Sequence, residues 1–303
     1  MVTRFLSGAG QVFVRSGGRL TYSGRAAYVP VMVDRAWVGL LAGCCAALLA
    51  AGTIGCGNDD DSGSRRLRIL VTNDDGVAAE GIDAVVEALV ADPDNDVVVS
   101  APDGNRSGSG DMMGPSQRCG DLAVTSSSTK SGYPATAING CPADAVIYAL
   151  DALYPAGELP DVVIAGINQG QNVSLLIAGS ISGTVGAART AARAGVPALA
   201  SSQGAPQPGA EFDYPAGAAA VMSWLEEHRE ALMAGVVSHS SVDNLNIPSC
   251  SSGAIRGTVV VPLAPETDGA LSAQNCESSL IEPRDDVEAL NNGFITLTAI
   301  PLA

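Results

Sequence analysis

The sequence predicts an α/β fold in three layers: a mostly parallel sheet with helices on both faces, followed by a smaller β-rich C-terminal appendage. Between residues 68 and 235, short apolar runs alternate with segments whose apolar residues recur at helical spacing. Each of the first three strand-like runs ends in a polar, glycine-containing loop, as is typical of open parallel sheets. From residue 236 to 302, strand-like runs continue without an obvious helix.

The predicted core elements follow one another in a regular order. Short runs rich in Val, Ile, Leu and Ala predict strands at residues 68–72, 96–102, 161–166 and 197–202. Apolar residues three or four apart predict helices at residues 81–91, 141–153, 184–194 and 214–233. In the appendage, strands are predicted at residues 244–247, 258–263 and 294–299.

Residues 1–56 indicate export. Several Arg residues and Met32-Val-Asp-Arg35 precede an almost unbroken apolar run from 36 to 55, which ends at Cys56. This order resembles a bacterial lipoprotein signal, in which the Cys is lipidated and becomes the mature N-terminus. Thr53 departs from that pattern, which prefers Leu there, and about 20 apolar residues could instead span a bilayer as an uncleaved anchor. We expect an exported protein that is anchored to a membrane, or alternatively secreted, and whose residues 57–67 form a flexible tether.

The net charge of the chain indicates which partners it can bind, and its cysteines indicate whether it forms disulfides. Residues 1–55 carry +4 of the total formal charge of −16, so a charge of −20 falls on the rest of the chain. Such an acidic domain is a poor partner for a nucleic-acid polymer. Outside the signal region the cysteines are Cys119, Cys141, Cys250 and Cys276, with no metal-type spacing. In an exported protein they predict two disulfides, for which sequence proximity favours Cys119–Cys141 and Cys250–Cys276; buried free thiols are the alternative.

Polar loops follow the predicted strands and converge on one edge of the sheet. Asn73-Asp-Asp-Gly76 offers two carboxylates, and Ser107 and Asn168 in the next loops are neutral oxygen donors. Together they form an oxygen-rich set suited to Mg²⁺ or Mn²⁺. Alone, the first loop is equally compatible with an ordinary Asp-Asp-Gly turn. Ser182-Gly183-Thr184 before a helix could bind phosphate or simply cap that helix.

These motifs, taken in order, resemble the survival protein SurE family. They are Asn73-Asp-Asp-Gly76, Ala101-Pro-Asp103 with Asn105-Arg-Ser-Gly108, Gly166-Ile-Asn168 and Ser182-Gly-Thr184. The resemblance covers roughly residues 68–302. It implies a Rossmann-like core and a divalent-metal-dependent phosphatase of the 5'- or 3'-nucleotidase or acid phosphatase type. The resemblance is also compatible with a homodimer.

Site roles carried over from the resemblance divide into two groups. The metal ligands would be Asp74, Asp75, Ser107 and Asn168, with both Asp residues also catalytic. Asn73, Asn105, Ser182, Gly183 and Thr184 would bind the phosphate of a nucleoside monophosphate. The residues leave the nucleophile open between water and a carboxylate. A non-catalytic exported ligand-binding lipoprotein is the competing function, although a simple binder has less need of the paired Asp residues.

Overall fold

The computed structural model describes residues 65–302, which contain a single nine-stranded sheet. Cys56, the predicted signal at residues 1–56 and residues 57–64 of the predicted tether lie outside this range. The strand order is β3-β4-β2-β1-β5-β6-β7-β9-β8. The six strands from β4 to β7 are parallel to one another, whereas β3 and β9 run antiparallel to their neighbours β4 and β7. The predicted α/β class with a mostly parallel sheet is therefore confirmed.

The parallel core contains the predicted alternation of strands and helices. Its strands are β1 (Leu67–Thr72), β2 (Asn95–Pro102), β5 (Val162–Gln169) and β6 (Ala198–Gln203). Its helices are α1 (Glu80–Val90), α2 (Pro142–Ala152), α3 (Gly183–Arg193) and α4 (Tyr214–Met233). Each lies within a few residues of the predicted range, because periodic apolar residues mark the faces that become buried.

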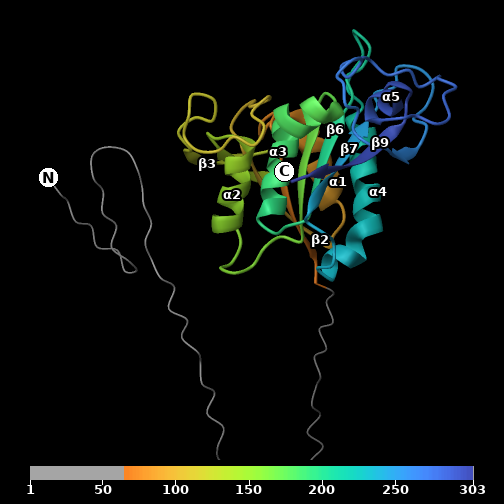
Figure 1. Cartoon of the computed structure of the whole chain (residues 1–303). Coiled ribbons are helices and arrows are strands. Elements are labelled where there is room, and N and C mark those ends of the chain that lie inside the picture. Colours follow the sequence, from red (N-terminus) through yellow and green to blue (C-terminus); the bar gives the residue numbers. More distant parts are fainter. Residues whose placement is uncertain (1–64, 303) are drawn as a thin grey trace, which may run out of the picture. The chain divides into compact units, whose positions relative to one another are not determined.

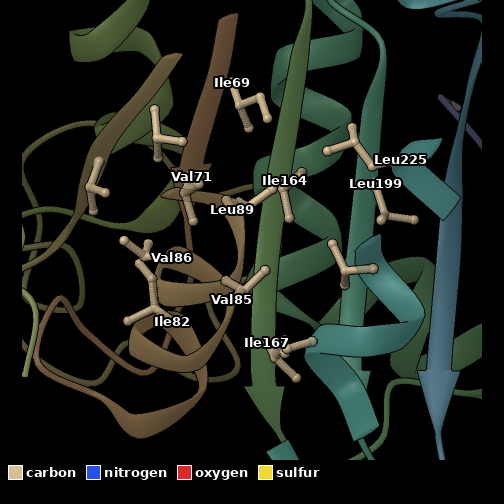
Figure 2. Close-up of a cluster of buried hydrophobic side chains, with 14 of the residues drawn as sticks. Ile69, Val71, Ile82, Val85, Val86, Leu89, Ile164, Ile167, Leu199 and Leu225 are labelled. Carbon is tan, nitrogen blue, oxygen red and sulfur yellow. The ribbon is translucent and has the colours of Figure 1, made fainter. Parts of the chain in front are cut away.

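Two apolar cores, one on each face of the sheet, make the three layers. On one face, side chains of α1 and α4, such as Ile82 and Leu225, pack against Ile69, Ile164 and Leu199 of the strands (Figure 2). On the other face, the small residues of α3 and Val146 of α2 pack against Leu70, Val163 and their neighbours. Figure 1 shows α2 and α3 on the opposite side of the sheet from α1 and α4. This arrangement leaves the carboxyl ends of the parallel strands open for a site.

Four elements were not predicted from the sequence. They are β3 (Val124–Ser128), β4 (Pro134–Ile138), the π-helical segment η1 (Ser174–Ile181) and α5 (Asp286–Asn291). All residues of β3 are exposed, so it lacks the apolar alternation that reveals a half-buried strand. The helix α5 has only six residues, too few for a helical period to stand out. The predicted strand at 258–263 is shorter in the structure, where β8 is Thr258–Val260.

The C-terminal strands extend the main sheet and do not form a sheet of their own. β7 (Ser241–Ile247) pairs with β6, and β9 (Ile295–Pro301) lies between β7 and β8. The long loops between β7 and β9, together with α5, form a loop-rich lobe at one end of the sheet (Figure 1). A small apolar cluster that includes Ala264, Ala270 and Leu290 stabilises this lobe. Within residues 65–302, none of the helices has the length and apolar character needed to cross a membrane.

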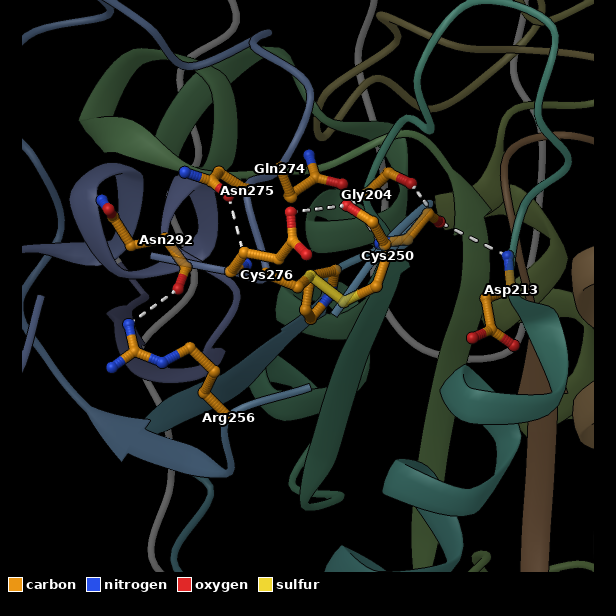
Figure 3. Close-up of a disulfide and its surroundings, with 12 residues drawn as sticks. Gly204, Asp213, Cys250, Arg256, Gln274, Asn275, Cys276 and Asn292 are labelled. Carbon is orange, nitrogen blue, oxygen red and sulfur yellow. Dashed lines mark hydrogen bonds between the residues drawn. A yellow bond between two sulfur atoms is a disulfide. The ribbon is translucent and has the colours of Figure 1, made fainter. Parts of the chain in front are cut away.

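Two disulfides link distant segments of the described chain. Cys119 is bonded to Cys141 at the start of α2, and Cys250 is bonded to Cys276 in the loops between β7 and α5. These are the pairs that sequence proximity favours. The Cys250–Cys276 bond lies beside Gly204 and Gln274 (Figure 3), next to the strand ends described below.

Candidate functional site

The loop after β1 turns sharply because the Asn73 side chain closes it. Asn73 Oδ1 accepts a hydrogen bond from the Gly76 N–H at 3.1 Å, and Asn73 Nδ2 donates to the Gly76 carbonyl at 3.0 Å. Gly76 has φ +108°, and a Cβ there would lie 2.9 Å from the Gly104 Cα. Asn73 is fully buried, so its contacts in the structure shape the loop that carries Asp74 and Asp75. Its predicted role in phosphate binding stays a prediction.

Asp74 is buried at the N-terminus of α3. Only 3% of the residue is exposed, and this burial raises the pKa of its carboxyl group. The Thr184 hydroxyl donates a hydrogen bond to Asp74 Oδ1 at 2.5 Å. This bond and the backbone N–H groups of Gly183 and Thr184 oppose that increase in pKa because they stabilise the charged form.

Asp75 lies beside Asp74 and is half-buried. Burial and the neighbouring Asp74 charge raise the pKa of Asp75 to about 7. Asp75 Oδ2 accepts from the Gln169 N–H at 2.8 Å, and Oδ1 accepts from Asn105 Nδ2 at 3.3 Å. Two adjacent carboxylates disfavour each other's charge unless a cation lies between them.

The loop after β2 brings Asn105 and Ser107 to the two carboxylates. The Arg106 N–H donates to the Asp74 carbonyl at 2.6 Å, which joins this loop to the loop after β1. Asn105 Oδ1 accepts from the Ser107 N–H at 2.9 Å, while its Nδ2 contacts Asp75. Asn105 therefore positions the Ser107 main chain and one Asp75 oxygen at the same time.

A bulge near the end of β5 places Asn168 in a cavity that Asp74 and Ser107 also line. The pairing of β5 with β6 shifts between Ala165 and Asn168, and Asn168 is 7% exposed. Its Nδ2 donates to the Gly170 carbonyl at 2.5 Å, which leaves Oδ1 as the atom that can coordinate a cation. Asp74, Ser107, Asn168 and Ser182 all line one cavity of about 270 Å³.

The Ser182-Gly183-Thr184 segment caps α3 and contacts Asp74. Ser182 Oγ accepts from the Val185 N–H at 3.1 Å, which is an ordinary helix cap. A Cβ at Gly183 would lie 2.9 Å from Asp74 Cβ, so glycine permits the close approach of the two loops. The structure thus brings the predicted metal-binding and phosphate-binding residues to one sheet edge. In the structure, Ser182 caps the helix and Thr184 donates a hydrogen bond to Asp74.

Two residues that the sequence did not single out also belong to this region. Ser109 is 2% exposed, and its hydroxyl has no hydrogen-bond partner among residues 65–302. A Cβ at Gly183 would lie only 2.6 Å from that hydroxyl, so Ser109 lies against the start of α3. Arg118 donates to the Ser107 carbonyl at 2.9 Å and forms no ion pair within the described part of the chain. Ser109 could have been included because it ends the polar loop after β2, whereas no local pattern marks Arg118.

The comparisons with known proteins agree with this geometry. A family model described as "Survival protein SurE" matches residues 69–268, about two thirds of the chain. The chain belongs to the survival protein SurE family. It is 36% identical over 194 residues to a protein of Methylocella silvestris named 5'-nucleotidase SurE, covering 64% of this chain and 71% of that one. A protein of the same name from Parvibaculum lavamentivorans is 30% identical over 241 residues, covering 78% of this chain and 76% of the relative.

Some SurE relatives match over less of their length. The aligned part covers 52% of the Methanothrix thermoacetophila protein, which is 40% identical over 146 residues. A crystal structure of the SurE protein from Aquifex aeolicus aligns with a TM-score of 0.60 and 24% identity, covering 78% of this chain and 94% of that chain. At that identity the likeness supports the fold alone.

The donor set of this SurE chain fits a hard divalent cation. Asp74 offers carboxylate oxygens to the cavity, and Ser107 and Asn168 add neutral oxygens, the ligand types that Mg²⁺ and Mn²⁺ accept. Asp75 lies next to Asp74 but does not line the cavity, and its carboxylate accepts from Asn105 Nδ2 and the Gln169 N–H. Burial and the charge of Asp74 raise the pKa of Asp75 to about 7. A positive ion would offset the repulsion between the two carboxylates. The unpartnered Ser109 hydroxyl lies close to them, against Gly183 at the start of α3, but Ser109 does not line the cavity.

Proposed function

We propose that this protein is a divalent-metal-dependent phosphomonoesterase that hydrolyses nucleoside 5'- or 3'-monophosphates to nucleoside and phosphate. The observation that supports the proposal is that Asp74 lines one cavity with Ser107 and Asn168, while the adjacent Asp75 contacts Asn105 and Gln169 of the neighbouring segments. The names of the relatives, 5'-nucleotidase SurE, support the same activity. Mg²⁺ or Mn²⁺ is the cation that the oxygen ligands favour.

Four residues would bind the cation, and one of them would also accept a proton from the attacking water. Asp74, Asp75, Ser107 and Asn168 would hold the cation. Bound there, it would neutralise the phosphate charge and make water a better nucleophile. Asp75 is more exposed than Asp74 and contacts the loop after β2 and the last residue of β5, so we assign to it the role of orienting the attacking water and accepting its proton.

Phosphate binding would come from neutral donors and the start of α3. Asn105 lies next to Asp75, and the Ser182-Gly183-Thr184 segment begins the helix whose positive dipole end faces the cavity. Ser109 adds an unused hydroxyl to this group. These donors would fix the phosphate while the organic group leaves toward the mouth of the cavity.

Release of phosphate from AMP and p-nitrophenyl phosphate tests the proposal. The protein is freed of metal with a chelator and assayed with Mg²⁺ or Mn²⁺ added back. We expect metal-dependent turnover, and we expect Asp74→Asn and Asp75→Asn each to lower kcat/KM by roughly 100-fold or more. Asp151→Asn is the matched control, because Asp151 is exposed near the end of α2. No turnover of either ester, together with tight binding of a nucleotide, would identify a binding protein instead.

We infer further that the protein is exported and anchored to a membrane through Cys56. Two disulfides in the described residues support this, because disulfides persist in oxidising compartments and are rare in the cytosol. Mass analysis of the mature N-terminal peptide tests it. A lipid-modified peptide that starts at Cys56 is expected, and a mature chain that starts earlier contradicts the lipoprotein assignment.

A further inference from the structure

The cavity beside Asp74 has a polar floor but an apolar rim. Its lining includes the buried polar residues Asp74, Asn168 and Ser182 and the exposed apolar residues Ile181 and Leu271. Ile181 is 43% exposed and Leu271 is 76% exposed. Large apolar side chains left open to water beside converging polar groups are typical of a ligand site.

Leu271 is held in place by two buried glutamines. Gln171 and Gln274, which are 4% and 3% exposed, both donate hydrogen bonds to the Ser272 carbonyl, at 3.1 and 3.0 Å. Gln171 Oε1 also accepts from the N–H of Ala205, another lining residue, at 2.7 Å, so Gln171 joins the Leu271 loop to a second lining segment. An exposed leucine therefore lies on a loop whose main chain is fixed by buried side chains.

The Cys250–Cys276 disulfide fixes the same loop from its other end. Gln274 Oε1 accepts from the N–H of Ser249, one residue before Cys250, at 3.1 Å. Gly204 packs so closely that a Cβ there would lie 2.7 Å from Gln274 Oε1. Ala270, next to Leu271, is buried in the small apolar cluster of the lobe.

Ile181 is fixed on the other side of the cavity. Its carbonyl accepts a hydrogen bond from the Gly110 N–H at 3.0 Å, in the loop that also carries Ser107. Ser182, the next residue, caps α3. The position of Ile181 is thus set by the loop after β2 and the start of α3, which also contact Asp74.

We propose that Ile181 and Leu271 form an apolar subsite for the organic group of the substrate. The site then prefers phosphomonoesters whose organic group carries an aromatic or other apolar part, such as the base of a nucleoside, over esters of small polar alcohols. This inference rests on the proposed phosphatase function, because the phosphate must lie on the polar floor for its organic group to reach the rim. An apolar group between the two side chains removes their exposed surface from water.

Binding of two non-hydrolysable phosphonates tests the subsite without turnover. The protein with Mn²⁺ is titrated by calorimetry with 1-naphthylmethylphosphonate and with 2,3-dihydroxypropylphosphonate. We expect the naphthyl compound to bind about tenfold more tightly or better. In the double variant Ile181→Ser/Leu271→Ser, the ratio should approach one, with the polar compound changed by no more than about twofold.

Val260→Ser is the matched control, since Val260 is 81% exposed on β8 and does not line the cavity. It should leave the affinity ratio unchanged. Equal affinities in the parent protein, or a preference that survives the double variant, would overturn the subsite. If the preference is present and lost in the double variant while no ester is hydrolysed, the subsite holds and the proposed phosphatase function fails.

Discussion

The bond between Thr184 and Asp74 shows how one hydroxyl can support a buried carboxylate. Asp74 loses its hydration on burial, and the Thr184 hydroxyl replaces part of that hydration at 2.5 Å. Thr184→Val keeps the shape and removes the donor. We expect the pKa of Asp74 to increase further, so that the variant needs about tenfold more metal for half-maximal activity.

Thr190→Val is the appropriate control for Thr184→Val. Thr190 lies on the same helix, is similarly buried and donates to the Gly186 carbonyl at 2.8 Å, away from Asp74. Metal titrations of phosphate release compare the two variants. An unchanged metal requirement in Thr184→Val would show that Asp74 needs no support from this hydroxyl.

Ser109 gives a prediction in which stability and activity move in opposite directions. Its buried hydroxyl has no partner within residues 65–302, and an unpaired buried polar group destabilises the folded state. Ser109→Ala should therefore keep or increase the free energy of unfolding, by up to about 1 kcal/mol. If the hydroxyl binds phosphate, kcat/KM should still fall by about tenfold. Denaturant unfolding and the phosphate-release assay measure the two effects; a loss of both would indicate a structural role.

The two disulfides offer a comparison at the level of elements. Their sequence separations are 22 and 26 residues, so the loop-closure model predicts a similar loss of about 3 kcal/mol in unfolding free energy when either is removed. Only Cys250–Cys276 is linked through Ser249 and Gln274 to the Leu271 loop. We expect Cys250→Ser/Cys276→Ser, but not Cys119→Ser/Cys141→Ser, to weaken the preference for the naphthyl phosphonate. Equal effects of the two variants on that preference would contradict a specific role for Cys250–Cys276.

Elements with a strong apolar pattern could be predicted from the sequence, and elements without one could not. The helix α4 has the predicted range of residues 214–233 because it buries one long face, including Trp224 and Leu225. The strand β3 has no buried residue, and its place at the sheet edge depends on pairing with β4. Likewise, β7 and β9 were expected in an appendage, but their pairing with β6 and with each other joins them to the main sheet.

At the scale of the whole molecule, topology explains why the site could be anticipated. Asp74 and Ser107 follow β1 and β2, and Asn168 lies near the end of β5; parallel strands bring their carboxyl ends to one edge. Leu271 could not be placed in this way. It reaches the cavity through long-range contacts, such as the bond from Gln171 Nε2 to the Ser272 carbonyl, that leave no mark in the local sequence.

We propose that Asp74, Asp75, Ser107 and Asn168 hold one divalent cation. A crystal structure of the protein grown with Mn²⁺, with anomalous diffraction measured at the manganese edge, locates the ion. We expect a single strong peak at about 2.0–2.3 Å from oxygens of both carboxylates, absent in crystals of Asp75→Asn. A peak elsewhere, or none beside Asp74 at saturating Mn²⁺, would show that these four residues do not form the metal site.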